Sequence, residues 1–141
     1  MKFERLGLII VLAGLMVDVS ARVHAVSYIT CHQLADKNGY TKCDLINVLP
    51  RYICSNCIIP DSVNIPVHTL DKKLKNNHKW PRDSKVVVYC AGGSCTLSKY
   101  AYEIFKNNGF NDVMVLEGGI SEWQQQGYPV TGKCTMGYLK S

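Results

Sequence analysis

The chain has 141 residues, of which 47% are hydrophobic and 19% are charged, and its formal net charge is +5 at pH 7. This composition is typical of one globular domain and excludes a disordered chain. The lysines are scattered apart from a cluster at Lys72, Lys73 and Lys75. Because this is neither a basic stripe nor a known binding module, we expect no nucleic-acid partner. The mild positive charge favours small anionic substrates.

The first 25 residues have the order of a secretory signal peptide. A short basic start precedes an unbroken apolar run, Leu6–Val17, and small residues follow it. The run has 12 residues, whereas a membrane-spanning helix needs about 20. We expect cleavage after Ala25, with cleavage after Ala21 as the alternative. An uncleaved N-terminal anchor is the competing interpretation.

Cleavage after Ala25 would leave a domain over residues 26–141. It would remove three basic and two acidic residues, so the net charge would fall from +5 to +4. We therefore expect a secreted or periplasmic monomer with no stable membrane span after cleavage.

Seven cysteines follow the predicted signal, and this odd number leaves at least one free unless a partner takes it. Cys31 and Cys43 flank one segment expected to contain a helix and a loop, and they could pair. Cys54-x-x-Cys57 lies in a predicted loop, whereas the redox motif usually opens a helix and a zinc site needs about four ligands. A structural disulfide or two unrelated thiols is therefore favoured there, and we expect no metal and no cofactor. The cysteines are Cys31, Cys43, Cys54, Cys57, Cys90, Cys95 and Cys134.

The first half of the mature chain predicts two short strands and a surface helix. Residues 44–48 and 63–66 have strand patterns, and residues 51–62 between them are expected to form a loop. Residues 69–77 are polar and rich in lysine, which suits a helix on the surface.

The second half predicts repeated strand and helix units. Residues 86–89 are apolar at every position, as in a central strand of a parallel sheet. An amphipathic helix is expected over residues 96–108, then a strand over 113–116 and a short helix over 120–124. This order predicts an α/β fold with right-handed crossovers. The expected apolar face of the 96–108 helix comprises Leu97, Tyr100, Ala101, Ile104 and Phe105.

Cys90 lies at the carboxyl end of the predicted 86–89 strand, where ligands bind in open α/β sheets. The glycines that follow allow the backbone to turn its N–H groups inward, and the next helix adds the positive end of its dipole. Both effects favour a thiolate, so we expect a lowered pKa for the Cys90 thiol. The chemistry also needs an open approach to the sulfur. The alternative is a small buried residue at a strand end.

Several stretches of this sequence resemble the rhodanese-like family. The matching residues are 86–95 (VVVYCAGGSC), 101–110, 113–123 and 127–130, with upstream landmarks at 45–48 and 58–66. The similarity spans about residues 28–131. It implies a rhodanese-like fold, with a central, mostly parallel sheet flanked by helices on both faces. It also implies a sulfur carrier whose catalytic cysteine, here Cys90, becomes a persulfide.

The sequence departs from the family pattern at three places. The family's active loop commonly ends with arginine, and Cys95 stands at that position. Without the guanidinium fork we expect weaker affinity for thiosulfate, and the cysteine phosphatases of this architecture also need that arginine. Asn47 and Leu49 replace an aspartate and an arginine, and Asn56-Cys57 replaces a Gly-His pair. A subgroup with a second cysteine five residues after the first resembles this chain.

We predict a sulfurtransferase in which Cys90 takes sulfane sulfur from a small donor and passes it to a protein thiol or another nucleophile. Cys95 is expected to attack oxidised or persulfidated Cys90, although packing the first turn of the helix is an equal alternative. The competing functions are a thiol–disulfide or redox-sensing protein that uses Cys90 and Cys95, and a non-catalytic binding module. The predicted substrate-binding residues are Ala91, Gly92, Gly93, Ser94, Cys95 and Thr96.

Overall fold

The computed structural model describes residues 24–36, 42–54 and 57–132, together with two short N-terminal strands. These strands, β1 (Val11–Leu12) and β2 (Leu15–Met16), pair antiparallel. Most of the predicted signal peptide lies outside the described residues, so the signal and its cleavage site stay predictions. In the described part of the chain, no helix has the length and apolar character needed to cross a bilayer.

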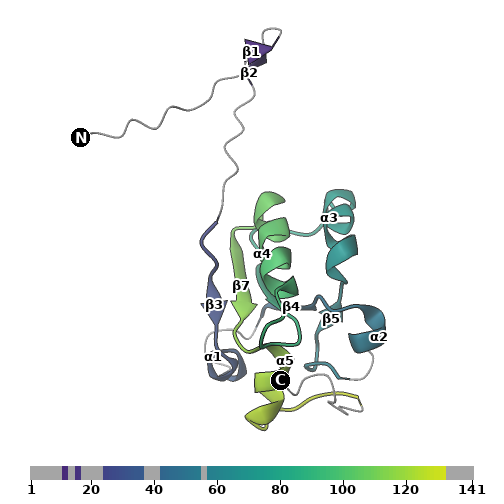
Figure 1. Cartoon of the computed structure of the whole chain (residues 1–141), viewed down its shortest axis with the longest axis vertical. Coiled ribbons are helices and arrows are strands. Elements are labelled where there is room, and N and C mark those ends of the chain that lie inside the picture. The colour runs from purple at the N-terminus through teal and green to yellow at the C-terminus, as the bar shows by residue number, and fades with distance from the viewer. Residues whose placement is uncertain (1–10, 13–14, 17–23, 37–41, 55–56, 133–141) are drawn as a thin grey trace, which may run out of the picture.

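Five strands form one parallel sheet in the order β3-β7-β6-β4-β5 (Figure 1). Strand β6 is central, because it pairs with β4 on one side and with β7 on the other. This arrangement confirms the predicted α/β fold with a parallel sheet. The strands are β3 (Tyr28–Ile29), β4 (Asp44–Asn47), β5 (Val63–Asn64), β6 (Lys85–Tyr89) and β7 (Asp112–Leu116).

Helices cover both faces of the sheet, as the sequence predicts. On one face, α3 (Val67–Asn76) and α4 (Leu97–Asn107) pack on alternate residues of β6 such as Val86 and Val88. On the other face, α1 (Cys31–Ala35) and α5 (Gly119–Gln125) lie over the core that contains Val87 and Tyr89. Successive residues of a strand point to opposite faces, so an uninterrupted apolar strand is buried on both sides.

Two elements differ from the sequence-based expectation. A short helix, α2 (Arg51–Cys54), occupies the start of the segment expected to be a loop. In α4, Tyr100 is 70% exposed, so its assignment to the apolar face was wrong. The buried face of α4 instead has the i, i+3, i+4, i+7 spacing of one helical stripe. Its members are Ser98, Ala101, Tyr102 and Phe105.

Cys31 and Cys43, whose pairing the sequence left open, are both free thiols. Cys31 is fully buried at the start of α1, and its Sγ donates to the backbone oxygen of Glu117 at 3.7 Å. Cys43 instead immediately precedes β4. Cys57 is disulfide-bonded, and its partner lies outside the side chains that the structure describes.

Candidate active site around Cys90

The residues 90–96, here called the Cys90 loop, connect the carboxyl end of β6 to α4. The loop turns tightly, with the Cys95 N–H donating to the Gly92 backbone oxygen at 3.1 Å. Gly92 has a φ of +104°, a conformation that favours glycine.

Backbone hydrogen bonds from the start of α5 hold the Cys90 loop in place. The backbone N–H groups of Ile120 and Ser121 donate to the backbone oxygens of Cys90 and Ala91, each at 3.0 Å. A Cβ atom on Gly119 would lie 2.5 Å from the Cys90 backbone oxygen. Gly119 therefore permits the close approach of α5 to the loop.

The Cys90 thiol lies beneath the loop and is covered. The residue is 2% exposed, and its Sγ donates to the Cys95 backbone oxygen at 3.5 Å and to Ser98 Oγ at 3.4 Å. The expected open approach to this sulfur is therefore absent from this conformation. The Cys95 carbonyl and Ser98, in the first turn of α4, lie against the thiol instead.

Ser98 is a site residue that the sequence analysis did not identify. It is 4% exposed, lies in the first turn of α4 and accepts from the Cys90 thiol. Its signal in the sequence is a polar residue on the buried face of an amphipathic helix, eight positions after the cysteine. A buried hydroxyl usually has a hydrogen-bonding partner, which makes such a position a candidate contact for the reactive group.

The Cys95 thiol lies next to Cys90, whose thiol donates to the Cys95 backbone oxygen at 3.5 Å. The neighbours that act on its pKa are the Cys90 side chain and the N–H groups of Ala91, in the loop, and of Leu97, at the start of α4. Burial raises the pKa of the Cys95 thiol, and the Cys90 contact raises it further, while the two N–H groups oppose the shift. The structure thus brings the two predicted catalytic cysteines together.

A cleft of about 790 Å³ opens over the Cys90 loop. Cys95, which is half-buried, lines this cleft, whereas Cys90 and Thr96 do not belong to its lining. Glu122 lines it, and no lysine or arginine is among the described residues of its wall. Thr96 is exposed and is the N-cap residue of α4. The lining comprises Ala91, Gly92, Gly93, Ser94, Cys95, Gly118, Ser121, Glu122, Gln125 and Gln126.

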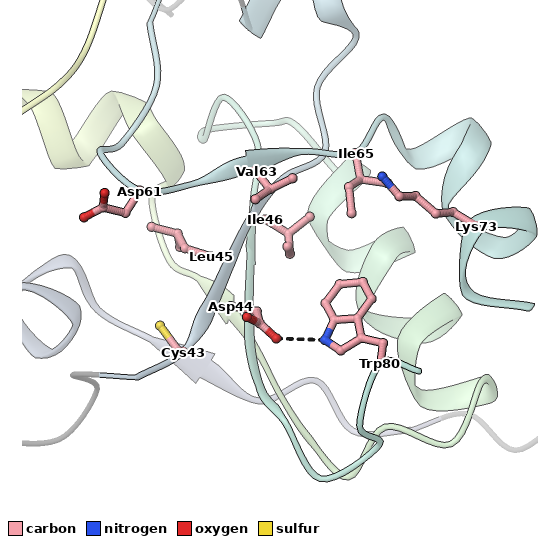
Figure 2. A pocket seen from close by; sticks show the side chains of 9 residues that line it. All are labelled: Cys43, Asp44, Leu45, Ile46, Asp61, Val63, Ile65, Lys73 and Trp80. Atoms are coloured by element: carbon pink, nitrogen blue, oxygen red, sulfur yellow. Dashed lines mark hydrogen bonds between the residues drawn. The ribbon is translucent and has the colours of Figure 1, made fainter. Parts of the chain in front are cut away.

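A separate cavity of about 250 Å³ lies beside β4 and β5, and Figure 2 shows its side chains. It contains the free thiol of Cys43 and an indole, Trp80, that donates to Asp44 Oδ2 at 2.8 Å. Burial raises the pKa of the Cys43 thiol, and the charge of Asp44 adds to the shift. Cys43 precedes β4, so it lies at the opposite end of the parallel sheet from Cys90. Ligands of open α/β sheets bind at the carboxyl ends of the strands, which favours the Cys90 end.

The side chains that the structure describes form no metal-binding cluster. No group of three or more His, Cys, Asp or Glu residues gathers there in a way that could hold an ion. The Cys90 loop and the first turn of α4 bring together two neighbouring thiols and the hydroxyl of Ser98.

The family model of the rhodanese-like domain matches residues 30–126, which include the whole Cys90 loop. The chain belongs to the rhodanese-like domain family. A rhodanese-related protein of Thermoplasma volcanium has a similar structure, with 30% sequence identity and a TM-score of 0.63. The match covers 74% of this chain and 97% of that chain.

Two relatives of this rhodanese-like domain bear different names. A sulfurtransferase of Allochromatium vinosum is 32% identical over 73 residues, which cover 52% of this chain and 64% of that protein. A tRNA uridine(34) hydroxylase of Citrobacter koseri is 45% identical over 77 residues, which cover 50% of this chain and 21% of that protein. The chain thus spans less than two thirds of either relative, and the family alone does not define its reaction.

Proposed function

We propose that this rhodanese-like domain is a sulfurtransferase in which Cys90 carries a persulfide. The observation that carries the proposal is the position of Cys90 at the carboxyl end of β6, in contact with a second thiol that lines an open cleft. The similarity to a sulfurtransferase supports the same reaction. The substrates would be a small sulfane-sulfur donor and an accepting thiol or other nucleophile. The proposed signal peptide would place the reaction outside the cytoplasm.

The proposed reaction has two transfers at sulfur. A cysteine thiolate attacks the sulfane sulfur of the donor, and the remainder of the donor leaves with the bonding electron pair. The acceptor then attacks the outer sulfur of the Cys90 persulfide and regenerates the thiolate. No net oxidation of the protein occurs. The backbone N–H groups of Ala91 and Leu97 act to lower the pKa of the neighbouring Cys95 thiol.

Replacing Cys90 tests the proposal directly. Sulfur transfer to cyanide is measured with thiosulfate, mercaptopyruvate and polysulfide donors for the wild type and for Cys90→Ser. We expect Cys90→Ser to lose at least about 100-fold in kcat/KM, because the Cys90 persulfide that the acceptor attacks cannot form. Cys43→Ser is the matched control, since it removes another free thiol that lies at the opposite end of the sheet. Equal activity of Cys90→Ser and the wild type would refute the assignment.

A thiol–disulfide function is the second candidate, because the Cys90 and Cys95 side chains are in contact. Mass mapping of the protein after exposure to a sulfur donor separates the two functions. An additional sulfur atom on a cysteine that a thiol removes indicates sulfur transfer. A reversible Cys90–Cys95 disulfide without added sulfur indicates redox function.

A further inference from the structure

The two thiols of the site differ in their access to a substrate. Cys95 lines the cleft over the Cys90 loop, whereas Cys90 is 2% exposed and lies outside the cleft lining. A donor that enters the cleft therefore meets Cys95 first. Any direct attack by Cys90 would require the loop to open, although Ile120 and Ser121 hold the backbone of Cys90 and Ala91 in place.

The surroundings of Cys95 place its thiol between the cleft and the second cysteine. Burial and the neighbouring Cys90 raise the pKa of the Cys95 thiol, and the N–H groups of Ala91 and Leu97 partly oppose that rise. Cys95 thus has the cleft on one side and the second thiol on the other. This position suits a thiol that carries sulfur between the cleft and Cys90.

We propose that Cys95 is the entry thiol of a two-cysteine relay, in which sulfur passes from the donor to Cys95 and then to the buried Cys90. This inference rests on the proposed sulfurtransferase function and names the residue that meets the substrate. The donor class is a hydropersulfide, R–S–SH. Storage on Cys90 would keep the persulfide away from water and from unselective acceptors.

The first step loads Cys95. The Cys95 thiol gives its proton to solvent, and the thiolate attacks the outer sulfur of R–S–SH. The bond between Cys95 Sγ and that sulfur forms, the S–S bond of the donor breaks, and R–S⁻ leaves with the electron pair and takes a proton. The products are the Cys95 persulfide and R–SH, so the oxidation state of the system is unchanged.

The second step moves the same sulfur inward. Cys90 Sγ attacks the outer sulfur of the Cys95 persulfide, and Cys95 Sγ leaves with the bonding electrons and receives the proton of the Cys90 thiol. The product is the Cys90 persulfide, whose outer sulfur keeps its proton, and the Ser98 hydroxyl, which accepts from Cys90 in the structure, can rotate to hydrogen bond with it. The acceptor then attacks the outer sulfur of the Cys90 persulfide, as in the proposed function.

A loading time course tests the relay on the full chain. The reduced protein is mixed with glutathione hydropersulfide, quenched by rapid alkylation and digested, and fragmentation of the peptide over residues 86–99 places the added sulfur. In the wild type we expect sulfur on Cys95 first and on Cys90 later. Loading should accelerate with pH, because burial raises the pKa of the Cys95 thiol and the thiolate is the nucleophile.

Three variants make the outcome decisive. We expect Cys90→Ser to load Cys95 at the initial rate of the wild type, Cys95→Ser to load Cys90 more slowly by at least about tenfold, and Cys43→Ser to behave as wild type. Cys90 loading at the wild-type rate in Cys95→Ser would overturn the relay and leave the sulfurtransferase intact. A wild-type protein that never carries sulfur on Cys90 would overturn the proposed function itself. The wild-type order of loading decides the question without a variant if Cys95→Ser fails to fold.

Discussion

Gly119 is the residue at which α5 and the Cys90 loop come closest. Its φ is +56°, and an added Cβ would lie 2.5 Å from the Cys90 backbone oxygen and 2.6 Å from the Gly92 nitrogen. Both neighbours are backbone atoms, so neither can move away without distorting the loop. We expect Gly119→Ala to lower the free energy of unfolding by at least about 3 kcal/mol and to impair sulfur transfer. Urea unfolding and the transfer assay measure the two effects.

Gly127→Ala is the matched control for this prediction. Gly127 also has a positive φ, of +80°, but an added Cβ would find no atom within 4 Å. We expect it to cost about 1–2 kcal/mol from backbone conformation alone and to leave sulfur transfer unchanged. Equal losses in the two variants would show that the close approach at Gly119 has no energetic consequence.

The sequence permits prediction of some residue roles in the site and not of others. The position of Cys90 at a strand end follows from the local pattern, because the order of strand, loop and helix defines it. The direction of the Cys95 side chain and the contact with Ser98 depend on how α4 packs against β6. Tertiary packing also decides that Cys90 is covered and Cys95 faces the cleft.

At the scale of elements, α5 supplies the wall of the cleft opposite the Cys90 loop, and Glu122 brings a negative charge to that wall. The described lining offers no cation to balance it, which strengthens the expectation from the missing loop arginine that thiosulfate binds weakly. We expect Glu122→Gln to raise kcat/KM for thiosulfate by about two- to tenfold, with a smaller gain at high salt. The assay uses cyanide as the acceptor.

Glu103→Gln makes the same change of charge outside the cleft lining. Glu103 lies on α4 and pairs with His24 at 3.1 Å. We expect little change in kcat/KM for thiosulfate in this variant. A similar gain in both variants would indicate an effect of net charge alone, and no gain in Glu122→Gln would contradict the electrostatic account of the cleft.

The elements that could be predicted are those with long, clear patterns. Strand β6, which is apolar over residues 86–89, and the amphipathic α4 are of this kind, and their type was correct. Edge strand β3 has two residues, so no periodicity is available to identify it. Helix α1 does have a local signal, since Thr30 and Gln33 form a reciprocal capping box. The exposure of Tyr100 was missed because the stripe that packs on the sheet is rotated from the one expected.

At the scale of the whole molecule, the sheet separates two hydrophobic clusters, and Cys31 belongs to the cluster beneath α1 and α5. Its thiol is fully buried, and it donates to the backbone oxygens of Glu117 at 3.7 Å and of Gly119 at 4.0 Å. Burial, with smaller contributions from the charges of Glu122 and Glu117, raises the pKa of this thiol from 9.0 to about 11. The unfolded chain therefore loses the proton of the Cys31 thiol at a lower pH than the folded protein does.

This difference predicts a loss of stability at alkaline pH. Below pH 9.0 the Cys31 thiol is protonated in both states, and its contribution to stability is fully present. As pH rises from 9.0 toward about 11, the unfolded chain ionises first, so the free energy of unfolding falls. Cys31→Ser removes the titrating group and keeps a small donor at the same position. Urea unfolding of both proteins at about pH 8 and about pH 10 should show a smaller loss for Cys31→Ser. Parallel losses in the two proteins would mean that the buried thiol does not couple folding to pH, because the other titrating groups are common to both.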